Sequence, residues 1–76
     1  MNSGYDLLVE KEAMWAEMLE QVLKDNDIQP VAIPVYGAGL ALKTGMQERF
    51  KIYVPIERMA QAKELLNELF PDDGIL

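Results

Sequence analysis

Residues 50–55, Phe50-Lys51-Ile52-Tyr53-Val54-Pro55, show the clearest strand pattern in the chain. Apolar side chains alternate there with Lys51 and Tyr53, and a period of two residues is typical of a β-strand with one buried face. Pro55 has a backbone φ suited to the first turn of a helix. The stretch predicts a strand over residues 50–54, followed at once by a helix over residues 56–69.

Two other segments show the same alternation and complete a sheet. Residues 5–9 and 31–36 are predicted strands, and the period-two rule places their larger apolar side chains on the helix-covered face. These side chains are Tyr5, Leu7, Val9, Val31, Ile33 and Val35. Pro34 has no backbone N–H, so its strand is expected at a sheet edge. Strand 50–54 then lies in the centre, and the predicted strand order is 1-3-2.

A helix is predicted over residues 12–25, where Ala, Met, Leu, Glu, Gln and Lys dominate. An apolar stripe at helical spacing marks its buried side, with Trp15 expected in the core. The stripe consists of Trp15, Met18, Leu19, Val22 and Leu23. Asp25-Asn26-Asp27 is a plausible helix end, because asparagine tolerates the left-handed conformation.

The predicted fold class is α+β. The element order gives a two-layer βαββα sandwich, ferredoxin-like, with a three-stranded sheet of order 1-3-2 and two helices on one face. Residues 1–76 are expected to form a single domain. Residues 71–76 are expected to be a flexible tail or the stub of a fourth strand beside the first.

Composition narrows the classes of function. The chain has 76 residues, half of them hydrophobic, a net charge of −6, and neither cysteine nor histidine. A domain of this size buries about 60% of its unfolded surface, so one modest core is expected. The negative charge argues against nucleic-acid binding, and the missing residue types remove thiolate metal sites and the usual general base. No secretory signal or membrane-spanning stretch is visible, and we expect a cytoplasmic protein.

The loop over residues 37–45, Gly-Ala-Gly-Leu-Ala-Leu-Lys-Thr-Gly, is not explained by folding alone. One interpretation is a hairpin connection with glycines at turn positions. The other is a ligand or partner loop, in which backbone N–H groups and the lysine hold an anion while the leucines meet a partner. The residue order does not match a P-loop or a dinucleotide fingerprint. Candidate residues are Gly37, Gly39, Leu40, Leu42, Lys43, Thr44 and Gly45.

The sheet face opposite the helices is a second candidate site. Leu8, Tyr36 and Tyr53 are predicted to lie on it, and tyrosine is enriched at interfaces because it combines an apolar ring with a polar end. The face either meets a partner or a second copy, or it is a solvated open face of an antiparallel sheet. The scattered carboxylates are interpreted as solvated helix surface, so no metal site is predicted.

Several segments together resemble a known family. They are Glu12-Ala13, Ala16-Glu17-Met18-Leu19-Glu20, Leu23, Ile28, Pro30-Val31, Tyr53-Val54-Pro55 and Ala62-Lys63-Glu64-Leu65-Leu66. The chain resembles the small bacterial domains described as prokaryotic signal-transducing proteins, a family of unknown function. The resemblance implies a fold related to ferredoxin-like regulatory proteins that respond to nitrogen status. It brings no catalytic motif.

The sequence thus predicts a small regulatory or adaptor module that acts in signal transduction by binding a protein partner or by forming a homodimer. The alternative is a sensor of an anionic metabolite that uses loop 37–45. Ser3 and Thr44 carry the aliphatic hydroxyls of the chain and have no histidine to activate them. We therefore predict a non-enzyme with no cofactor, no nucleic-acid partner and no membrane association.

Overall fold

A computed structural model describes residues 4–35 and 48–71 of the chain. The elements are β1 (Tyr5–Glu12), α1 (Ala13–Asp25), β2 (Val31–Val35), β3 (Arg49–Pro55), a 3-10 turn η2 (Ile56–Arg58) and α2 (Met59–Leu69). The strands form an antiparallel sheet of order β1-β3-β2. The predicted α+β class and the central position of the third strand are confirmed.

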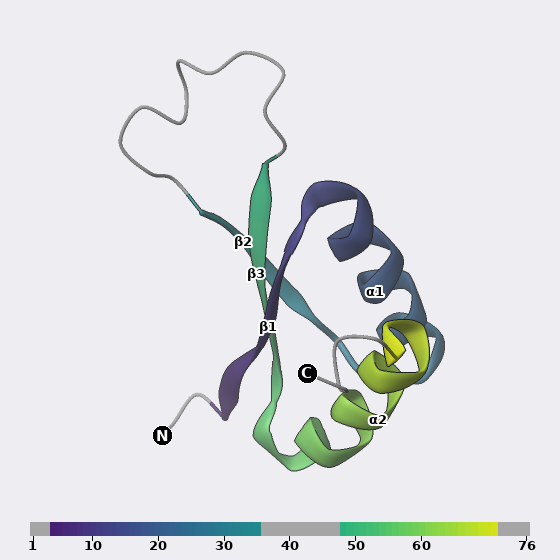
Figure 1. The fold of residues 1–76 in the computed structure, drawn as a ribbon. Helices are drawn as coiled ribbons and strands as arrows, with labels where there is room; N and C mark the ends of the chain where they lie inside the picture. The colour runs from purple at the N-terminus through teal and green to yellow at the C-terminus, as the bar shows by residue number, and fades with distance from the viewer. Residues whose placement is uncertain (1–3, 36–47, 72–76) are drawn as a thin grey trace.

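The two helices lie on the same side of the sheet in Figure 1, and no described helix or strand covers the other side. The core lies between these layers. It is built from side chains of α1, α2, β3 and the segment after α1, and consists of Ala16, Leu19, Leu23, Ile28, Ile52, Val54 and Ala62. No buried residue in this core is polar or charged among the described residues.

The ferredoxin-like layout is not confirmed. That layout uses four strands, and the described ranges 4–35 and 48–71 contain three. The expected fourth-strand stub falls almost wholly on residues 72–76, which lie outside those ranges. The coarser architecture is therefore an antiparallel three-stranded sheet with two packed helices.

Strand β1 continues beyond the predicted residue 9 to Glu12, and it contains a β-bulge. Leu7 pairs with Tyr53 and Val9 pairs with Ile52, so Leu8 is an extra residue in the ladder. A bulge places two residues of one strand opposite one of its partner and thereby resets the alternation. Leu8 and Val9 both pack against the core. Leu7 instead pairs with Tyr53 on the side of the sheet away from the helices, so the prediction that it faces the helices is wrong.

Strand β2 also turns the opposite face to the helices from the one predicted. Ala32 pairs with the fully buried Ile52 and packs against the core. Val31 and Ile33 lie on the other face, where they are 43% and 46% exposed. Every residue from Val31 to Val35 is apolar, so hydrophobic alternation could not choose between the two faces.

Trp15 is another correction, because it lies at the protein surface and not in the core. Its side chain is 41% exposed and packs edge-to-face against Phe70, with ring centroids 5.6 Å apart. The Lys11 ammonium lies 4.2 Å from the centre of the same Phe70 ring. Ala16 occupies the buried position beside Trp15 on α1, so the buried stripe is rotated toward smaller side chains.

Helix α1 ends at the predicted place, but Asp27 and not Asn26 takes the left-handed conformation. Asp27 has φ 65°, whereas Asn26 has φ −108°. The Asp27 N–H donates to the Lys24 carbonyl and the Ile28 N–H to the Leu23 carbonyl. These two bonds define a Schellman motif, which also brings the residue after the left-handed position against the last turn of the helix. Ile28 and Leu23 are both fully buried.

We predict that Asp27→Gly stabilises the protein by about 0.5–1 kcal/mol, because glycine adopts positive φ without the steric cost of a Cβ. Arg58 would keep its hydrogen bond, since its guanidinium donates to the Asp27 backbone carbonyl at 3.1 Å. Urea denaturation measures the change. Asn26→Gly is the matched control and should destabilise, because its φ is negative and its side chain donates to the Val22 carbonyl. Equal effects of the two variants would contradict the prediction.

Candidate protein-interaction surface

The face of the sheet opposite the helices, which we call the open face, is built from four rows of cross-strand neighbours. The pairing register defines the rows, because directly paired residues point to the same side of a sheet. From one end to the other they are Tyr5–Pro55, Leu7–Tyr53–Val31, Glu10–Lys51–Ile33 and Glu12–Arg49–Val35. Three strands thus contribute side chains to one continuous surface.

One end and one edge of the open face are apolar. Tyr5, Leu7, Val31 and Ile33 are half of the eight large hydrophobic residues that are exposed in the described part of the chain. Tyr53 is half-buried between Leu7 and Val31. The Tyr5 hydroxyl donates to the Gln29 carbonyl at 3.3 Å. A contiguous apolar surface of this kind on a small domain marks an interaction site more often than an isolated exposed leucine does.

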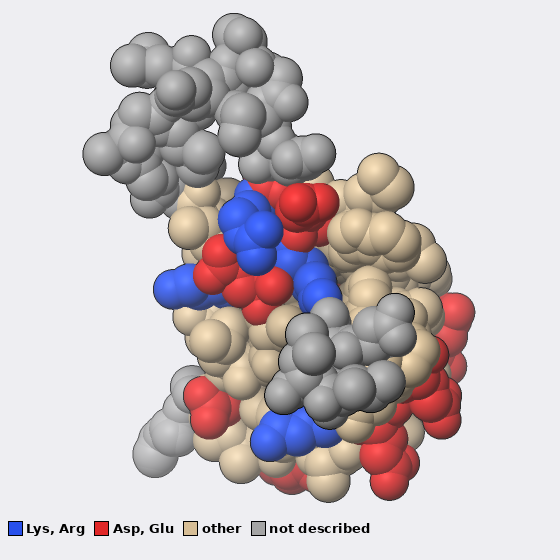
Figure 2. Space-filling model, viewed as in Figure 1, with Lys and Arg blue, Asp and Glu red and all other residues tan. Residues whose placement is uncertain are grey.

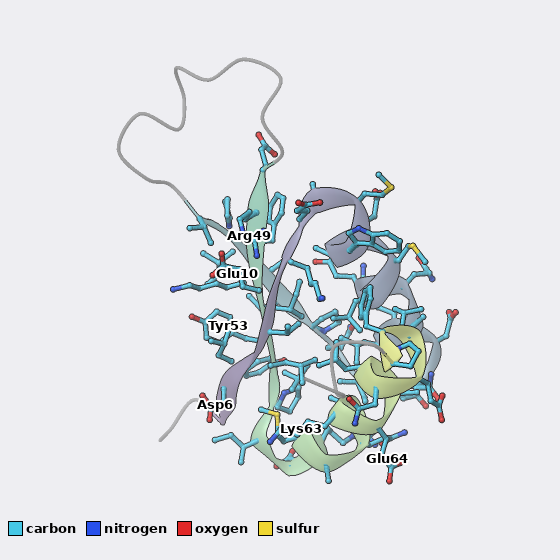
Figure 3. All side chains as sticks on the ribbon, in the orientation of Figure 1. Asp6, Glu10, Arg49, Tyr53, Lys63 and Glu64 are labelled. Carbon is cyan, nitrogen blue, oxygen red and sulfur yellow. The ribbon has the colours of Figure 1, made fainter. Side chains whose placement is uncertain are left out.

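The other end of the open face carries charges of both signs. Arg49 Nε donates to Glu10 Oε2 at 2.8 Å, and both side chains remain partly exposed. Figure 3 shows Glu10, Arg49 and Tyr53 on the side of the sheet away from the helices. Lys51 and Glu12 complete the charged rows. Two acids and two bases make this end electrically neutral, and an exposed pair of this kind adds at most about 1 kcal/mol to stability.

The outer edge of β2, with which no described strand pairs, borders the open face and is limited as a docking strand. A hydrogen-bonded antiparallel pair exchanges two N–H···O bonds, which the Pro34–Phe50 pair cannot do because proline has no N–H. In a regular ladder the flanking pairs, Ile33–Lys51 and Val35–Arg49, make those bonds. Pro34 then removes an N–H from the outer edge. Prolines at such positions hinder edge-to-edge pairing, so the face is favoured over the edge as a contact.

A cavity of about 250 Å³ opens between α1 and the sheet, on the helix-covered side. Four apolar residues and three glutamates line it. It is lined by Ala13, Ala16, Glu17, Glu20, Ala32, Glu48 and Phe50. The volume is below the roughly 300 Å³ at which small-molecule sites begin. Within residues 4–35 and 48–71, no group of three or more acidic side chains is placed to bind a metal ion.

The structure describes two of the residues predicted for the interaction sites. Tyr53 lies on the open face, as expected. Leu8 does not, because the bulge directs it toward the core, against which it packs. Tyr36 lies outside the described residues, and so do Gly37, Gly39, Leu40, Leu42, Lys43, Thr44 and Gly45.

Sequence reasoning missed five apolar residues of the open face. They are Tyr5, Leu7, Val31, Ile33 and Val35. The sequence of β3 contains part of the missing information, because Lys51 marks the polar side of the sheet and Ile52 marks the buried side. Assigning the residues of β2 to the polar or the buried side requires the register Ile33–Lys51. A hairpin connection of unknown geometry does not reveal that register.

No family model matches this chain, and neither a curated protein nor a solved structure does. None of the described helices has the length and apolar character required to cross a membrane.

Proposed function

We propose that this protein is a small regulatory or adaptor module that acts by binding another protein through the open face of its sheet. The observation that carries the proposal is the apolar surface of Tyr5, Leu7, Tyr53, Val31 and Ile33, which the helices leave bare. Non-obligate interfaces combine such an apolar centre with a polar rim, and the charged rows at Glu10 and Arg49 supply the rim.

The chemistry of the chain supports binding over catalysis. The sequence has no histidine or cysteine, and the described residues include no buried polar side chain. Histidine is the most frequent general acid–base residue, and the cysteine thiol is a common nucleophile. The resemblance to the prokaryotic signal-transducing family supports a role in signal transduction in the cytoplasm. A ferredoxin-like relationship belongs to the same proposal.

Affinity capture from the source cell tests this function. Tagged wild-type protein and Ile33→Glu would serve as baits, with captured proteins quantified by mass spectrometry. Ile33 lies in the row Glu10–Lys51–Ile33 and is 46% exposed. Its replacement should therefore lower the amount of captured partner at least 10-fold while the fold is kept. Met14→Glu is the matched control: it adds the same charge on α1, at a residue that is 67% exposed.

Partners retained by both wild type and Met14→Glu but lost by Ile33→Glu would support the open face as the binding surface. Captured sets that are identical for all three baits would defeat the proposal. The alternative function, sensing of an anionic metabolite by residues 37–45, concerns a segment outside the described residues. A thermal-shift screen of phosphorylated metabolites, with Lys43→Ala as the comparison, tests it separately.

A further inference from the structure

We infer that the open face binds a second copy of this chain, as a face-to-face sheet dimer that is weak and reversible. The inference rests on the proposed function and names its partner. In such a dimer two sheets stack about 10 Å apart, with their strands within about 30° of parallel or antiparallel alignment. The apolar rows around Tyr53 would be buried on both copies, because a two-fold interface uses the same surface twice.

The balance of charge favours a second copy over a basic partner. The described residues include 11 acids and 6 bases, of which the open face takes two each, so nine of those acids and four of those bases lie elsewhere. In Figure 2 the two signs gather together over β1 and β3, whereas acidic side chains prevail along the rim formed by the helices. Two copies that approach through their neutral faces keep the acidic surfaces furthest apart.

The same face is also self-complementary. Its acids, Glu10 and Glu12, come from β1, and its bases, Arg49 and Lys51, come from the neighbouring strand β3. No ion pair of Lys51 occurs among the described residues. A copy turned about a two-fold axis can therefore place acids of one β1 near bases of the other β3. Opposite charges in this arrangement set the orientation of the two sheets more than their affinity.

The size of the face sets the expected strength. Three strands about 4.8 Å apart and four rows about 6.7 Å apart give a surface of roughly 15 Å by 27 Å. A stable dimer buries about 800 Å² on each partner, and this face is smaller than that. We therefore expect a dissociation constant on the order of 10⁻⁴ M, at the weak end of specific association.

Sedimentation equilibrium of the full chain at about 10 µM to 1 mM tests the inference. Wild type should pass reversibly from monomer to dimer across this range. Ile33→Glu should weaken dimerisation at least about 30-fold, because it places a carboxylate in the apolar contact. Ile33→Thr keeps the β-branched shape and should weaken dimerisation about 5-fold. Met14→Glu should dimerise like wild type, and far-UV circular dichroism verifies that each variant is folded.

Ionic strength provides a second readout, which separates a second copy of the chain from a basic partner. Two copies that each carry −6 repel, and salt screens that repulsion, so dimerisation should be roughly 3- to 5-fold tighter in 0.5 M than in 0.05 M NaCl. A contact that depends on a basic partner would weaken with salt.

The dimer inference fails if wild type remains monomeric at 1 mM, or if Ile33→Glu and Met14→Glu dimerise equally well. Its failure is distinguishable from failure of the proposed function. A monomeric protein whose capture of other proteins still depends on Ile33 keeps the function and loses the dimer. A protein that dimerises but captures no other protein through this face keeps the dimer and loses the function.

Discussion

Leu23→Ala should lower the free energy of unfolding by about 3 kcal/mol, as expected for the truncation of a fully buried leucine. Leu23 is fully buried, and its carbonyl accepts the Ile28 N–H in the Schellman motif that closes α1. Truncation removes apolar contacts and leaves a cavity between α1 and the side chain of Ile28. In a domain this small, the total stability is near the low end of the usual 5–15 kcal/mol.

Thermal denaturation should show the loss as a midpoint lowered by roughly 15 °C, since 1 kcal/mol shifts a domain of this size by about 4–8 °C. Met14→Ala on the same helix is the control. Its side chain is 67% exposed, so it should change the stability by less than about 0.5 kcal/mol. If the two variants lost the same stability, Leu23 would not be part of the core.

Lys51→Pro should cost about 3 kcal/mol or more and abolish the native fold under mild conditions. Lys51 lies in the central strand, opposite Glu10 on one side and Ile33 on the other. Proline at this position would remove the N–H that bonds to β2, leave a carbonyl unsatisfied and restrict φ in the middle of the sheet. Far-UV circular dichroism and urea denaturation measure the effect.

Two controls separate the backbone effect from other causes. Lys51→Thr removes the same side chain and keeps the N–H, so it should stay within about 1 kcal/mol of wild type. Pro34→Ala changes a proline in edge strand β2 and should also stay within about 1 kcal/mol. A stable, folded Lys51→Pro variant would mean that β3 is not paired on both sides.

Much of the fold could be read from the chain because local chemistry determines it. Alternation in β3, helix-forming residues in α1 and the proline in β2 were sufficient for the α+β class and the 1-3-2 strand order. Pro34 carried most information, since a residue without an N–H is excluded from a central strand. The end of α1 was also predictable, although Asp27 and not Asn26 has the positive φ.

The candidate site was less predictable, because its residues depend on which face each strand turns to the helices. Tyr53 was placed correctly, since it alternates with the buried Ile52 and Val54. Leu8 was misplaced because a bulge shifts the alternation by one residue. Ile33 was misplaced because its strand is apolar on both faces, and only pairing with Lys51 shows which face is covered.

By itself, the sequence determined the elements, their order and the edge position of β2, all of which follow from local backbone chemistry and periodicity. Only the pairing of the strands in the folded protein shows which side of the sheet the two helices leave uncovered. That choice depends on the register of three strands and on small residues: Ala32 and Ala16 lie toward the interior, while the larger Val31 and Ile33 remain outside. A shift of one residue in pairing exchanges the two faces, and no local pattern in β2 opposes it.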